Sequence, residues 1–122
     1  MLERQYQALK RLSLTQKAKI NLEKSKRNLN DVKQKIELEI QRAKSDFNFA
    51  SKDLDTKKQA LELAERIEQK NQIKFAEGMA SSFELSQAQT QLYSAQQQYI
   101  QGMFNLINKY VILDALVNPN EN

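Results

Sequence analysis

The sequence contains no cysteine, histidine or tryptophan, and only one proline and two glycines among 122 residues. Without cysteine and histidine, the chain lacks disulfides, thiolate nucleophiles, the usual zinc ligands and the commonest general base. We therefore expect no catalytic residue, no metal site and no cofactor, and we do not expect an enzyme. No run of eighteen apolar residues and no apolar run of signal-peptide length occurs, so we expect neither a membrane-spanning helix nor an export signal.

Charge is unevenly distributed along the chain. Residues 1–44 carry twelve Lys and Arg against five Asp and Glu, whereas residues 45–122 carry seven against ten. A basic segment can attract nucleic acid or anionic lipid, but these charges are not interleaved with aromatic side chains that could stack on bases. We favour solvation of a long helix surface and expect no nucleic-acid partner.

The residues that are abundant favour helix. From Leu2 to Glu77 there is neither glycine nor proline, which predicts one helix over about residues 2–77, roughly 110 Å long. Large and small apolar residues alternate along it with a period of seven, which is typical of a coiled coil. Few globular proteins contain a helix of this length, so the pattern indicates an extended all-α structure.

A stop signal and a start signal for helix follow one another closely after Glu77. Gly78 can adopt the left-handed conformation that ends a helix, and Ser81 with Glu84 forms a capping-box pattern for the next one. The second helix is predicted over about residues 82–116, before Pro119. The short turn predicts an antiparallel coiled-coil hairpin, with residues 1–122 as a single domain.

The returning helix repeats the seven-residue pattern, so the two helices are predicted to meet along one seam. Folding about residues 79–80 would place Gly102 near Lys57 and Ala95 near Ala64. The predicted seam comprises twelve residues from both helices: Ile40, Phe47, Leu54, Leu61, Ala64, Leu85, Ala88, Leu92, Ala95, Tyr99, Leu106 and Leu113.

Two features are not explained by a hairpin alone. The returning helix is too short to cover roughly the first forty residues, which therefore require another packing partner. Its surface is rich in glutamine and carries no charge between Glu84 and Lys109. This surface either meets other helices, lines a wet passage or is simply solvated. Phe83, Tyr93, Tyr99 and Phe104 are predicted to serve packing rather than ligand stacking.

One spacing resembles a known family. Phe75, Gly78, Ser81, Leu85, Ala88, Leu92, Ala95 and Tyr99, followed by Asn105-Leu106 and by Leu113 and Leu116, resemble the C-terminal repeat of TolC-like outer-membrane efflux proteins. The resemblance covers about residues 45–117. It implies a fragment of a periplasmic helical domain, in which a long helix descends to a tip and a shorter helix returns.

The resemblance also implies a function. Hairpins of three protomers would form a periplasmic helical tunnel of an outer-membrane export channel, and the tip would dock a periplasmic adaptor protein of a tripartite pump that includes an inner-membrane transporter. The implied docking residues are Glu77, Gly78, Met79, Ala80, Ser81 and Ser82.

Two other functions remain open from the residues alone. A cytosolic coiled-coil scaffold or adaptor would show the same heptads, but it would not require an exposed tip at Gly78 and Met79. A basic nucleic-acid-binding hairpin would lose affinity steeply as salt rises.

Overall fold

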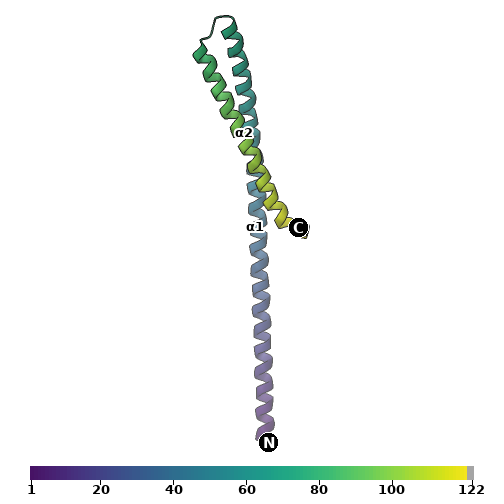
Figure 1. Cartoon of the computed structure of the whole chain (residues 1–122). Coiled ribbons are helices and arrows are strands. Elements are labelled where there is room, and N and C mark those ends of the chain that lie inside the picture. Colours follow the sequence, from purple (N-terminus) through teal and green to yellow (C-terminus); the bar gives the residue numbers. More distant parts are fainter. Residues whose placement is uncertain (121–122) are drawn as a thin grey trace. The chain divides into compact units, whose positions relative to one another are not determined.

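The computed structural model describes residues 1–120 and contains, within them, two helices and no strand. Helix α1 spans Leu2–Ala76 and helix α2 spans Ser82–Val117 (Figure 1). The prediction of an all-α hairpin with a long first helix and a shorter return helix is confirmed. The predicted helix ends, at about residues 77 and 116, each differ from the structure by one residue.

Helix α1 ends because Gly78 takes a positive φ of 75°. The Met79 N–H donates to the Lys74 carbonyl at 2.8 Å, and the Gly78 N–H donates to the Phe75 carbonyl at 3.1 Å. These two bonds define a Schellman ending, which satisfies carbonyls that the last helical turn would otherwise leave without partners. The first half of the turn is therefore set by backbone chemistry at one glycine.

Helix α2 begins with the predicted capping box. The Glu84 N–H donates to the Ser81 hydroxyl at 3.2 Å, and the Ser81 N–H donates to the Glu84 carboxylate at 3.1 Å. At the other end, the Asn118 N–H donates to the Asp114 carbonyl at 2.8 Å. Pro119 follows directly, and the residue before a proline is disfavoured in helix. Local sequence thus fixes both ends of α2.

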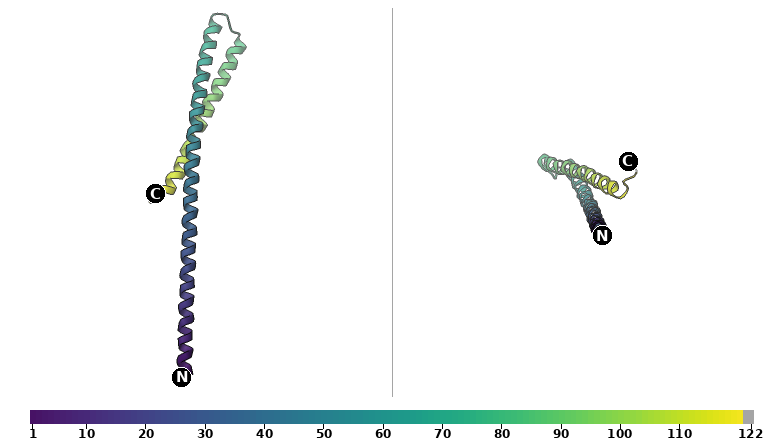
Figure 2. Two further views of the ribbon diagram at one scale, coloured as in Figure 1. Left: turned by 180° about the vertical axis from the view of Figure 1, so that it is seen from behind. Right: turned by 90° about the horizontal axis from the view of Figure 1, so that it is seen from below.

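Between residues 40 and 120 the two helices run antiparallel and cross each other (Figures 1 and 2). The buried residues in this part of the chain are all small: Ala43, Ala50, Ala88 and Gly102. Small residues at the contact let the two helix backbones approach closely, while the larger seam residues pack beside them half-buried. The core of this hairpin is therefore a narrow seam rather than a thick apolar layer.

The chain divides into two compact units, Met1–Glu39 and a second unit that begins at Ile40. In the first unit every residue is exposed. Its helix therefore has local hydrogen bonds but no buried side chain. The assignment of residues 1–122 to a single domain stays a prediction.

Candidate interaction surfaces of the hairpin

Each of the twelve predicted seam residues is buried or half-buried in the structure. Ala88 is the most buried of them, and the other eleven are half-buried. Two alanines of α1 outside this set are also buried, since Ala43 is 6% exposed and Ala50 is 2% exposed. They lie at the same heptad position as Ala64, which is half-buried.

At two positions along the seam, α1 and α2 pair in the register expected from the sequence. A β-carbon placed on Gly102 would lie 3.1 Å from Lys57 Cδ, so Gly102 faces Lys57. Ala64 and Ala95 line the same shallow depression between the helices. Further from the turn, the rings of Phe47 and Tyr110 lie 6.2 Å apart between centroids at an interplanar angle of 54°. Such a tilted aromatic pair adds to the stability of the contact.

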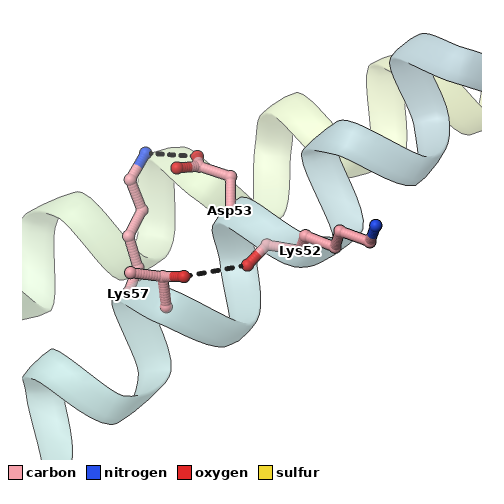
Figure 3. A network of polar contacts seen from close by, with 4 residues as sticks. Lys52, Asp53 and Lys57 are labelled. Atoms are coloured by element: carbon pink, nitrogen blue, oxygen red, sulfur yellow. Dashed lines mark hydrogen bonds and ion pairs between the residues drawn. The ribbon is translucent and has the colours of Figure 1, made fainter.

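The only salt bridge in residues 1–120 lies at this seam. Lys57 Nζ is 2.9 Å from Asp53 Oδ2, one turn earlier in α1, and both side chains remain about a third exposed (Figure 3). The Thr56 hydroxyl next to it donates to the Lys52 carbonyl at 3.2 Å (Figure 3). An ion pair of this kind within one helix contributes only about 0.3–0.5 kcal/mol to stability. It matters here mainly because it fixes the position of the Lys57 side chain.

The tip, defined as residues 77–82, is largely exposed. Ala80 is half-buried and the other five residues are exposed. Met79 is 76% exposed and Phe83, in the first turn of α2, is 74% exposed. The structure thus presents two large apolar side chains to solvent beside a rigid, fully capped turn.

The sequence analysis missed a second apolar face on α2. This face lies next to the seam on the surface of α2. Its exposed large apolar side chains are Tyr93, Ile100, Met103, Phe104, Ile107, Tyr110 and Val111. Their spacing of three, four and seven places them on one contiguous helix face. The sequence signal for this second apolar face is the large apolar residue that follows several seam positions of α2 by one place.

Three of the four aromatic residues predicted to serve packing are largely exposed in this chain. Phe83, Tyr93 and Phe104 are each exposed over more than 60% of their surface, and only Tyr99 is half-buried. A seam between two helices is too narrow to cover a ring that lies one position away from it, so packing of these three rings against other helices stays a prediction.

Comparison with known proteins identifies the chain. Residues 6–118 match the family model described as outer membrane efflux protein, which covers both helices and the turn. The chain belongs to the outer membrane efflux protein family. No curated protein and no solved structure gave a match. Membership supports a role in an outer-membrane efflux channel, and it agrees with the suspected TolC-like resemblance.

The outer membrane efflux protein family consists of channel proteins. Over residues 1–120 there is no buried polar side chain and no group of three acidic residues placed to hold a metal ion. Neither helix of the described residues has an apolar stretch long enough to cross a membrane.

Proposed function

We propose that this hairpin is a passive element of the periplasmic helical tunnel of an outer-membrane efflux channel. In this proposal three protomers form the tunnel, and the hairpin tip docks the adaptor protein of a tripartite pump with an inner-membrane transporter. The observation that carries the proposal is the family match over residues 6–118, which includes the turn as well as both helices. No bond is made or broken by the hairpin itself.

The large exposed surface of the chain supports assembly into a multi-helix structure. Its accessible surface is 10643 Å² for a mass of 14.2 kDa. A compact monomer of that mass exposes about 6,800 Å², so the excess is roughly 3,900 Å². Obligate protein interfaces bury about 2,000–5,000 Å² summed over both partners, which is about 1,000–2,500 Å² on each. The excess is therefore larger than one such interface would take from this chain, as expected if several neighbouring helices cover it in a closed tunnel.

The faces of α2 support the same assignment. Residues 85–108 carry no charge. The second apolar face lies on one side of this segment, and another side carries Gln87, Ser94, Gln101 and Asn108 at seven-residue spacing. In the proposed tunnel the apolar face meets a neighbouring helix, and the neutral polar side can contact water without a fixed charge that would select the sign of a solute.

The tip supports the docking part of the proposal. Met79 and Phe83 are exposed beside a turn whose backbone is held by the Schellman ending and the capping box. Apolar side chains on a pre-ordered turn can be buried by a partner with little loss of backbone entropy. Methionine also adapts its shape to a partner surface. We therefore assign docking to residues 77–82 together with Phe83.

The test is a site-specific photo-crosslink with a matched control. Residues 40–120 would replace the corresponding hairpin of a characterised efflux channel, expressed with the adaptor of its pump. A photo-reactive phenylalanine analogue would be placed at Phe83 or at Phe49. These two phenylalanines are equally exposed at 74%, but Phe49 lies along α1 away from the tip.

The proposal predicts an adaptor crosslink from position 83 and none from position 49, in cells whose chimeric channel still exports. Equal crosslinking from both positions, or none from position 83 in an exporting chimera, would contradict tip docking. A chimera that assembles no channel at all would contradict the tunnel assignment.

A further inference from the structure

Gly102 is an unexpected residue at its position. It lies buried in the interior of α2, where glycine is less favourable than alanine for helix formation. Its backbone does not require glycine, because Gly78 is the only residue among 1–120 with a positive φ. The space around it is tight, since a β-carbon there would lie 3.1 Å from Lys57 Cδ and 3.2 Å from Leu54 Cδ1, and both side chains would have to move by a few tenths of an ångström.

Lys57 is equally unexpected on the opposite helix. It occupies a heptad position that is alanine one heptad before and one heptad after, at Ala50 and Ala64. Its side chain lies across Gly102, and its ammonium is held by Asp53 of the same helix at 2.9 Å (Figure 3). The aliphatic part of a lysine can pack against a helix backbone while its charged end stays near water. Gly102 provides the space that this packing needs.

We propose that Lys57 and Gly102 are a matched pair that fixes where α1 and α2 cross. The aliphatic part of the Lys57 side chain occupies the space that the missing side chain of Gly102 leaves free. The ion pair with Asp53 limits the directions that the Lys57 side chain can take.

Sliding α2 along α1 by one heptad is energetically unfavourable in both directions. Shifted one way, Lys57 would lie level with Lys109, and two like charges would meet in a half-buried seam. Shifted the other way, Lys57 would lie level with Ala95, whose β-carbon would fill the space that Gly102 leaves open. Apolar heptads alone tolerate such shifts, whereas a polar seam residue can specify one register.

The proposal is tested by a double-mutant cycle on the full chain, with Lys57→Ala, Gly102→Ala and the double variant. The measurement is the equilibrium constant of unfolding in urea, followed by helix content. Gly102→Ala is expected to raise the unfolding constant about threefold to tenfold when Lys57 is present. In the Lys57→Ala background the same substitution is expected to raise the unfolding constant less, because only the contact with Leu54 Cδ1 remains and alanine favours helix.

Two controls separate this pairing from general effects. Ala95→Gly changes the same heptad position one heptad away, and it should show no coupling with Lys57→Ala. Lys57→Met keeps the length of the aliphatic side chain without its charge, so the coupling with Gly102→Ala should persist. Coupling no larger than that of the Ala95→Gly cycle, or its loss in Lys57→Met, would overturn the proposal.

A disulfide readout covers variants that unfold too easily for urea titration. The natural chain has no cysteine, so Ala64→Cys with Ala95→Cys reports the register seen in the structure, and Asn71→Cys with Ala95→Cys reports a one-heptad shift. Gly102→Ala should lower the yield of the first disulfide relative to the unsubstituted pair. An unchanged yield would also overturn the proposal.

Discussion

Individual residues decide where this chain reverses. Gly78 accepts a φ of 75°, and apart from its two chain neighbours no residue has an atom within 4 Å of the position where its β-carbon would be, so the constraint there is conformational rather than steric. Ser81 then supplies the hydroxyl that caps α2, and Glu84 returns the bond. These hydrogen bonds all join residues within 74–84, so the geometry of the turn is set by local sequence.

Replacing Gly78 by alanine tests this at the residue scale. A residue with a side chain costs about 1–2 kcal/mol in the left-handed conformation, so the free energy of unfolding should fall by that amount. Gly78→Asn should lose less, because asparagine tolerates this conformation better. Urea unfolding followed by circular dichroism measures both. Equal losses in the two variants, or none, would show that φ at position 78 does not limit stability.

At the scale of helices, α1 consists of two parts with different support. From Ile40 onward the helix buries Ala43 and Ala50 and packs its larger seam residues beside them. In residues 1–39 every side chain is exposed, although Leu22, Leu29, Val32 and Ile36 continue an apolar pattern. Helical stability in proteins comes mainly from packing an apolar face, so the first part needs a neighbour to be stable.

Deleting residues 1–39 tests this at the scale of the helix. Because that segment buries nothing, its removal should change the free energy of unfolding of the hairpin by less than about 0.5 kcal/mol. Hydrogen exchange on the intact chain should show faster exchange for amides of residues 1–39 than for amides around Ala50. If the deletion lowered the free energy of unfolding by several times this amount, residues 1–39 would have to be held by contacts within the chain.

Large apolar side chains are exposed along both helices of the described residues. The second apolar face of α2 and the exposed apolar residues of residues 1–39 add to the excess of accessible surface. Extended apolar faces of this kind are covered by other helices in stable proteins. The isolated chain should therefore be marginally stable and should self-associate, although its oligomer need not be that of the assembled channel.

Sedimentation velocity tests this at the scale of the molecule. The chain should sediment as concentration-dependent oligomers, and Phe104→Lys combined with Ile107→Lys should shift it towards monomer, because both substitutions place charge on the second apolar face. Phe49→Lys, an exposed phenylalanine on α1, serves as the control and should change little. A strictly monomeric, sharply melting wild-type chain would contradict the expectation.

The sequence by itself determined the helices, the turn and the pairing of the hairpin. Their causes are local, since a glycine-free run, a Gly78 ending and a Ser81 cap act within a few residues of each other, and the short turn between them makes the helices antiparallel. Only the tertiary structure decided which apolar residues stay uncovered. Phe83, Tyr93 and Phe104 are as apolar as the seam residues, but a seam between two helices covers one narrow stripe on each, and a periodic pattern does not say how many partners a helix has.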